Sequence, residues 1–227
     1  MNKITLRAIA IVIVVLLIDQ FVKIWVKTHM LSGEELLIIG NWFRVHFVEN
    51  AGMAFSIELP GQYGKLLLST FRIIAIGGII YLIRNMIKTN AHPGLIYCGS
   101  MILAGAVGNV LDSAFYGLVF TESYHNVAHF VPIGQGYAGF MEGHVVDMLW
   151  FPIIHGVFPD WLPVWGGEYF EFFRPVFNVA DAAITTGVFI IILFQKRFFA
   201  EKEIEAVNTD TETASPSNES KEEILTD

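Results

Sequence analysis

Four long apolar stretches constrain this chain more than any other feature. A helix needs about 20 residues to cross the hydrocarbon core of a bilayer. The stretches run over residues 6–26, 66–83, 95–119 and 179–194. Because helices satisfy their own backbone hydrogen bonds in lipid, we expect a mainly α integral membrane protein with four transmembrane helices. The composition agrees: only 16% of the residues are charged, against about 25% in a typical soluble domain.

Basic residues near the ends of these stretches predict the orientation of the chain, because cytoplasmic flanks carry an excess of lysine and arginine. These residues precede the first stretch, join the second to the third, and follow the fourth: Lys3, Arg7, Arg84, Lys88, Lys196, Arg197 and Lys202. With four spans they all fall on one side. We therefore expect both termini in the cytoplasm and two outer loops, at about residues 28–64 and 120–177.

The first stretch follows a short basic start and so resembles a secretory signal. However, Asp19, Gln20 and Lys23 continue its helical pattern where a cleavage site would stand. We therefore expect an uncleaved membrane anchor.

The two outer loops differ in composition. Residues 36–48 are β-rich and partly alternating, which predicts one or two short strands that form an outer cradle. Residues 150–173 carry Phe, Tyr and Trp with Pro and Gly between them. Aromatic rings favour the headgroup level, so we expect this segment along the outer membrane–water boundary. The alternative is a small aromatic core beneath a long loop.

Residues 200–227 form an acidic tail that we expect to be disordered and cytoplasmic. Residues 201–227 hold nine acidic and two basic residues, and so supply most of the net charge of −8. The rest of the chain, residues 1–199, is nearly balanced and is expected to form one membrane domain. No basic patch indicates nucleic acid binding. A single cysteine excludes a disulfide framework or a multi-cysteine metal site.

Charged side chains at membrane depth are costly, so each is a candidate for function. The candidates are Asp19, Lys23, Asp112, Asp147 and Asp181. Asp19 and Lys23 are four residues apart, in the favourable order for an ion pair on one helix face. We expect this pair to be structural.

The other three aspartates are expected at one level, near the outer boundary. Asp112 lies about 26 Å along the third stretch at about 1.5 Å per residue, with Asn109 on the same face. Asp181 lies at the outer end of the fourth stretch, and Asp147 lies within an apolar run, residues 145–150, just before the aromatic loop. Close carboxylates in a low dielectric share a proton. Such a pair suits aspartic proteolysis, in which one member activates water and the other protonates the carbonyl. Alternatively, these aspartates cap helices or pair with Arg174.

Histidines offer a competing site. His125 and His129 are at helical spacing with Glu122 nearby, and His144 precedes Asp147 by three residues. These ligand types bind zinc. Because loop histidines are usually solvated, we expect no metal.

Five short segments carry polar residues on the expected elements. They are Asp19-Gln20-Phe21-Val22-Lys23, Glu49-Asn50-Ala51-Gly52-Met53-Ala54-Phe55-Ser56, Gly105-Ala106-Val107-Gly108-Asn109-Val110-Leu111-Asp112, Val145-Val146-Asp147 and Phe177-Asn178-Val179-Ala180-Asp181. In this order they resemble the motifs of bacterial lipoprotein signal peptidase (signal peptidase II), a family of four-span membrane aspartic proteases. The resemblance covers nearly all of residues 10–195, and the joint occurrence of the five segments is specific.

The resemblance implies roles for individual residues. The catalytic pair would be Asp147 and Asp181. Substrate-binding or supporting residues would be Asn50, Asn109, Asp112 and Asn178. The first helix would be braced by Asp19 and Lys23.

The resemblance also implies a reaction without metal or other cofactor. The substrate would be a lipid-modified prolipoprotein, cleaved on the amino side of its diacylglyceryl-cysteine near the outer face of the bacterial cytoplasmic (inner) membrane. The expected partners are these substrates and membrane lipid, without nucleic acid, and we expect a monomer.

The chain departs from the family pattern in two places. The family usually has arginine directly after the aspartate of the third segment, and this chain has Ser113. A substrate-contacting cation is therefore missing or supplied from elsewhere, for which Arg174 is the candidate. The loop at 150–173 is also longer than in compact members, and we expect it to act as a lid.

Two other classes of function compete with a protease. A small transporter would use the carboxylates as a proton or cation relay, but it needs polar groups spread across the membrane. A non-catalytic assembly or lipid-interaction protein explains the apolar composition but leaves the five polar segments without a role.

Overall fold

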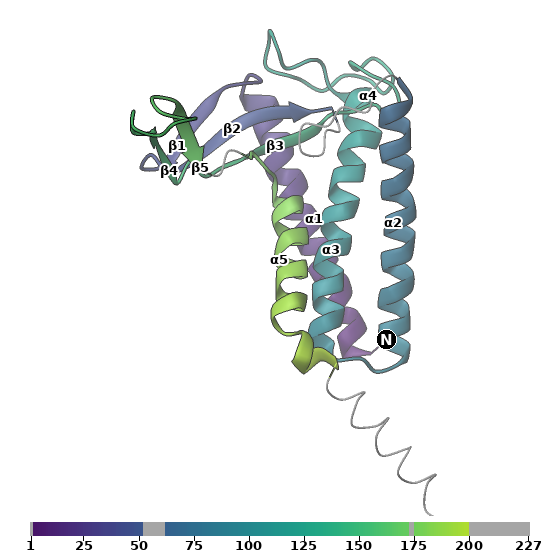
Figure 1. Ribbon diagram of the computed structural model, residues 1–227. Helices are drawn as coiled ribbons and strands as arrows, with labels where there is room; N and C mark the ends of the chain where they lie inside the picture. The colour runs from purple at the N-terminus through teal and green to yellow at the C-terminus, as the bar shows by residue number, and fades with distance from the viewer. Residues whose placement is uncertain (1, 52–61, 173–174, 200–227) are drawn as a thin grey trace, which may run out of the picture.

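The computed structural model describes residues 2–51, 62–172 and 175–199. Its helices are α1 (Lys3–His29), α2 (Gln62–Lys88), α3 (Pro93–Leu111), the π-helical η1 (Asp112–Tyr116), α4 (Gly117–Val119) and α5 (Val179–Leu193). Its strands are β1 (Glu35–Ile39), β2 (Phe43–Asn50), β3 (Val145–Trp150), β4 (Ile154–Val157) and β5 (Tyr169–Phe172). Figure 1 shows the four long helices side by side, with all strands at one end. We call this the sheet end.

Helix α3 lies in the middle of the bundle and contacts α1, α2 and α5. Two glycines let its neighbours approach closely. A Cβ atom at Gly105 would lie 2.2 Å from the carbonyl oxygen of Ala180 in α5. A Cβ atom at Gly108 would lie 2.7 Å from Oδ2 of Asp19 in α1. Both contacts require the absence of a side chain, so these glycines fix how closely α1 and α5 pack against α3.

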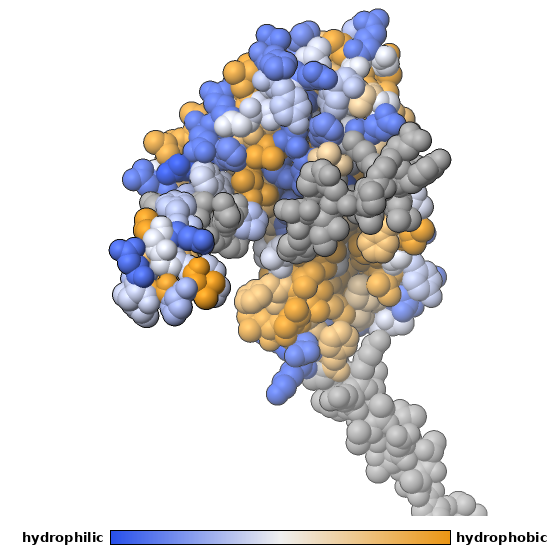
Figure 2. Space-filling model, turned by 45° about the horizontal axis from the view of Figure 1, so that its top comes forward, coloured by the Kyte–Doolittle hydropathy of each residue, from blue (hydrophilic) through white to orange (hydrophobic). Residues whose placement is uncertain are grey.

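The outside of the bundle is apolar, as a membrane protein requires. Phe21, Ile74 and Phe189 lie on three different helices and are each more than 60% exposed. Figure 2 shows hydrophobic residues over the helices and mostly hydrophilic residues at the sheet end. Three described helical segments are long and apolar enough to cross a membrane: Lys3–His29, Ser69–Lys88 and Pro93–Val119.

Helix α5 is shorter than the other three long helices. Its 15 residues rise about 22 Å, against about 30 Å for a typical hydrocarbon core. It packs along α3 and α1, and a further helical turn follows over residues 195–199. The predicted count of four transmembrane helices therefore stays a prediction, whereas the apolar helical bundle is confirmed.

The expected strands in residues 36–48 are present as β1 and β2. Strand β2 is central in a three-stranded antiparallel sheet of order β1-β2-β3. Buried side chains of the sheet pack against residues at the end of α1 and against residues that follow α3. Together these residues form one hydrophobic cluster: Val26, Met30, Phe47, Tyr116, Phe120, Val146 and Met148. This core holds β3 across the end of the bundle.

Strands β4 and β5 form a separate antiparallel hairpin within the aromatic segment. Phe158 packs on Phe170 with ring centroids 4.5 Å apart and lies 6.3 Å from the ring of Trp165. Trp161 and Val164 are strongly exposed, and Figure 1 shows the hairpin projecting sideways from the bundle. The hairpin thus contains ring packing and also presents apolar side chains outward. Its place at a membrane boundary and its role as a lid stay predictions, and the expected disordered tail lies outside the described residues.

Candidate active site

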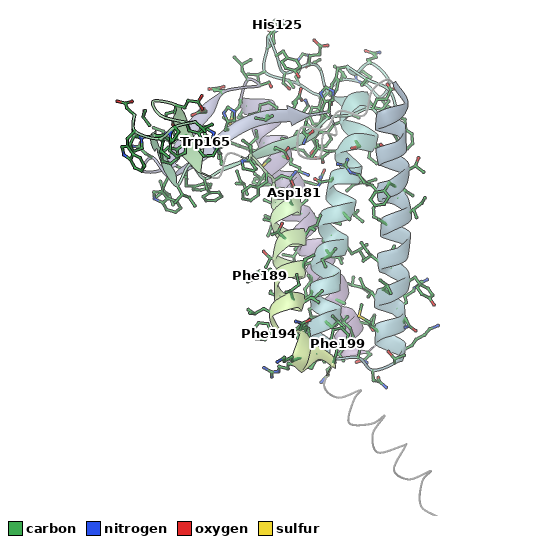
Figure 3. The ribbon with its side chains drawn as sticks, in the orientation of Figure 1. His125, Trp165, Asp181, Phe189, Phe194 and Phe199 are labelled. Atoms are coloured by element: carbon green, nitrogen blue, oxygen red, sulfur yellow. The ribbon has the colours of Figure 1, made fainter. Side chains whose placement is uncertain are left out.

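Two aspartates from separate parts of the chain come together at the sheet end, where β3 contacts α1 and η1. Asp147 lies in β3 and is 5% exposed. Asp181 lies in the first turn of α5 and is partly exposed. Figure 3 shows Asp181 at the end of α5 that faces the sheet. A backbone bridge between Leu149 and Phe177 joins β3 to the residues that precede α5, so both aspartates stand on a connected support.

A chain of side-chain amides links the two carboxylates. Asn178 Nδ2 donates to Asp147 Oδ1 at 2.7 Å and to Asn109 Oδ1 at 3.1 Å. Asn109 Nδ2 in turn donates to Asp181 Oδ1 at 2.7 Å. The two asparagines therefore orient one oxygen of each aspartate, Oδ1 of Asp147 and Oδ1 of Asp181.

Asn178 has this position because it is the N-cap of α5. Its Oδ1 accepts a hydrogen bond from the backbone N–H of Asp181 at 2.8 Å. Asparagine is a favoured N-cap, because its side chain satisfies a backbone donor that the helix leaves open. The same residue thus starts the helix and orients Asp147.

The environment of Asp147 favours its protonated form. Burial and the neighbouring charge of Asp181 raise the pKa of Asp147 to about 7. Hydrogen bonds donated by Asn50, at 3.2 Å, and by Asn178 act in the opposite direction. Near neutral pH this carboxyl can therefore hold a proton beside a second carboxylate.

A fully buried lysine joins α1 to the base of the site. Lys23 Nζ lies 2.9 Å from Asp19 Oδ2 and 2.7 Å from Asp112 Oδ2, and it donates to Asn109 Oδ1 at 2.9 Å. Asp19, Lys23 and Asp112 are all 0% exposed. The expected Asp19–Lys23 pair is present, and Asp112 joins it. Asp112 lies in this buried cluster rather than on a surface open to substrate.

The buried carboxylates also receive backbone hydrogen bonds. Asp19 Oδ1 accepts from the N–H of Ala180 at 2.8 Å. Asp112 Oδ2 accepts from the N–H of Val146 at 3.4 Å, and Gln20 donates to its Oδ1 at 2.9 Å. The residue that precedes each catalytic candidate therefore donates its backbone N–H to this buried cluster. Val146 precedes Asp147, and Ala180 precedes Asp181.

Sequence analysis missed a second buried ion pair. Lys27 pairs with Glu49 and donates to Ser123 at 3.0 Å. Burial opposes ionisation of Glu49, but hydrogen bonds and charge from His144 and Lys27 lower the pKa of its carboxyl overall. The pair ties α1 to β2, next to Asn50. The spacing of Lys23 and Lys27 on one helix face could have indicated it.

Arg72 was also missed, although it lies within the predicted second span. Its Nη1 donates to Ser113 Oγ at 3.3 Å. Its guanidinium interacts electrostatically with Asp181, Asp112 and Asp147. The rule that singles out charges at membrane depth would have found it. Arg174, the cation suggested from the sequence, lies outside the described residues.

The histidines do not assemble a site in the part of the chain that is described. Among residues 2–51, 62–172 and 175–199, no group of three or more His, Cys, Asp and Glu side chains has metal-binding geometry. His125 is exposed and lies at the tip of a loop beyond the sheet end (Figure 3). His144 faces Glu49, with 3.7 Å between Nδ1 and Oε2.

Comparisons with known proteins agree with the motifs. A sequence model of the family described as signal peptidase (SPase) II matches residues 11–197. A lipoprotein signal peptidase of Porphyromonas gingivalis is 47% identical over 83% of this chain and 82% of its own. One of Amoebophilus asiaticus is 36% identical over 99% of this chain and 92% of its own.

Two solved structures, both titled as a bacterial membrane enzyme determined by the in meso method, resemble the fold. One has a TM-score of 0.53 at 23% identity and covers 82% of this chain and 90% of its own. The other has a TM-score of 0.52 at 22% identity and covers 96% and 94%.

Proposed function

Because this chain belongs to the signal peptidase II family, we propose that it is an aspartic endopeptidase whose Asp147 and Asp181 activate water. Membership of the family makes it a membrane protease that removes signal peptides from prolipoproteins. The finer proposal is cleavage on the amino side of the lipid-modified cysteine. The observation that carries the aspartic mechanism is the amide chain through Asn178 and Asn109, which orients both carboxylates at one place.

The division of labour within the pair follows from burial. Asp147 is the more buried member and has the raised pKa, so in the resting enzyme it holds the shared proton. Asp181 is partly exposed and so is the member of the pair that is more open to water. Asp181 is therefore the general base and Asp147 the general acid.

The reaction then needs no group beyond water and the two side chains. Asp181 accepts a proton from water while the water oxygen bonds to the scissile carbonyl carbon. Asp147 gives its proton to the carbonyl oxygen. When the carbon–nitrogen bond breaks, the proton held by Asp181 passes to the departing nitrogen. Asp147 recovers its own proton as the carbonyl forms again.

The orientation of the site is part of the proposal. Basic residues lie at the end of the bundle opposite the sheet, among them Lys3, Arg84 and Lys88. This end would face the cytoplasm of the bacterial inner membrane, with both termini there. The dyad would then lie near the outer boundary, the level at which a lipid-modified cysteine next to a signal helix leaves the bilayer.

Cleavage assays with two isosteric variants test the proposal. Asp147→Asn and Asp181→Asn should each lower kcat by roughly 10³-fold or more, because the pair acts as a unit. Asp160→Asn, at an exposed position of the hairpin, is the matched control and should keep full activity. The substrate is a diacylglyceryl-modified precursor, with the unmodified precursor run in parallel. Activity within tenfold of wild type in either variant contradicts the mechanism, and equal cleavage of both precursors contradicts the proposed specificity.

A further inference from the structure

Arg72 brings a guanidinium from α2 to the dyad. It is partly exposed on a helix that otherwise faces α3 and lipid. It interacts electrostatically with Asp181, Asp112 and Asp147. A cation at membrane depth is costly and is expected only where it has a role.

The surroundings of Arg72 suggest that this role involves a ligand. Among the described residues no carboxylate forms an ion pair with it. Its hydrogen bond to the buried Ser113 fixes the guanidinium but does not neutralise it. Arginine carries five N–H donors in a planar fork, so several stay available next to the catalytic carboxylates.

Unlike Arg72, the buried Lys23 has its charge neutralised by neighbouring carboxylates. Lys23 is enclosed and its ammonium is occupied by Asp19, Asp112 and Asn109. It therefore cannot reach a substrate. Within the described part of the chain, Arg72 is the cation that lies close to the dyad and is also partly exposed.

We propose that Arg72 binds a peptide carbonyl oxygen of the precursor beside the scissile bond and so holds that bond against Asp147 and Asp181. This inference rests on the proposed function. In an extended precursor the carbonyl groups beside the scissile bond would have no helical partner and would need donors. The hydrogen bond that Arg72 donates to Ser113 Oγ orients the guanidinium for this contact. Arg72 thus supplies, from α2, the cation that the family usually has at the position of Ser113.

The first test compares three arginine variants in cleavage assays. Arg72→Gln should lower kcat/KM about 10- to 100-fold, as expected for loss of a charge-assisted hydrogen bond. Arg72→Lys keeps the charge without the planar fork and should lose less. Arg84→Gln removes the same charge from an exposed position at the other end of α2 and should have no effect. A value for Arg72→Gln within threefold of wild type, or an equal loss in Arg84→Gln, overturns the proposal.

The second test moves the arginine. In Arg72→Gln/Ser113→Arg a cation is again present beside the dyad, now from η1. The kcat/KM of this double variant should therefore be at least tenfold higher than that of Arg72→Gln. A double variant that unfolds at the wild-type temperature but is no more active than Arg72→Gln contradicts the proposal. A purely structural role of Arg72 predicts no such recovery.

Binding separates this inference from the proposed function. In an Asp147→Asn background, a fluorescent diacylglyceryl-modified precursor should bind at least tenfold more weakly when Arg72 is also replaced by Gln. If the wild-type protein does not cleave the precursor but binding still depends on Arg72, the contact is supported and the protease function is contradicted. If the wild type cleaves the precursor and binding does not depend on Arg72, the protease function is supported and the contact is contradicted.

Discussion

Removing one hydrogen bond to Asp147 should move the pH profile of cleavage in a defined direction. Asn50 donates to Asp147 Oδ2 at 3.2 Å and holds the pKa of Asp147 down against burial and the charge of Asp181. Asn50→Ala removes this donor, so the ionised form loses a partner and the pKa must rise above its value of about 7. A hydrogen bond to a charged group contributes about 1.5–3 kcal/mol, and about 1.36 kcal/mol corresponds to one pKa unit. Because this bond is long, we expect the lower end, a rise of about one unit.

The assay is kcat/KM for a diacylglyceryl-modified precursor between pH 5 and 10. Activity should fall as pH rises through the pKa of the pair, because the proposed mechanism requires a protonated Asp147 as the acid. In Asn50→Ala this alkaline limb should lie about one unit higher. Asn85→Ala, at an exposed position in α2, is the control and should keep the wild-type profile. An alkaline limb that stays in place or moves to lower pH in Asn50→Ala would refute the reasoning.

Two further substitutions test the supports of the site. Lys23→Met leaves the buried carboxylates of Asp19 and Asp112 without their cation and should destabilise the protein by about 3–5 kcal/mol; an unchanged unfolding temperature in detergent would argue against this. Gly105→Ala places a Cβ atom 2.2 Å from the backbone of α5, so both the unfolding temperature and cleavage should fall. Gly77→Ala, where a Cβ atom meets nothing within 4 Å, should leave both unchanged, and equal effects of the two alanines would contradict close packing of α3 on α5.

Much of the fold could be predicted from the sequence because bilayer thickness and backbone satisfaction leave few choices. The apolar stretches at 6–26 and 95–119 correspond closely to α1 and to α3 with its continuation through η1 and α4. The second stretch, predicted at 66–83, is the longer helix α2, since polar residues at both ends continue the helix beyond the apolar segment.

The contacts within the site could be predicted only in part. The Asp19–Lys23 pair is local, so spacing alone predicted it. The hydrogen bond from Asn109 to Asp181 joins residues 72 positions apart, and periodicity along one helix carries no information on such a contact. The third member of the buried ion cluster, Asp112, was assigned to the site lining from the resemblance, whereas packing of α3 on α1 places it beneath β3.

The candidate site combines residues from α1 through α5, and this order along the chain affects when activity can begin. The backbone N–H of Ala180 meets Asp19 across 161 positions of sequence, and Asp181 itself belongs to the last described long helix. A ribosome delivers α1, the sheet and α3 to the membrane well before it delivers α5. A partly made chain therefore has one aspartate of the pair without the other. Hydrolytic competence would thus arise only after α5 has been made and inserted, so that a chain still lacking α5 cannot cut neighbouring precursors.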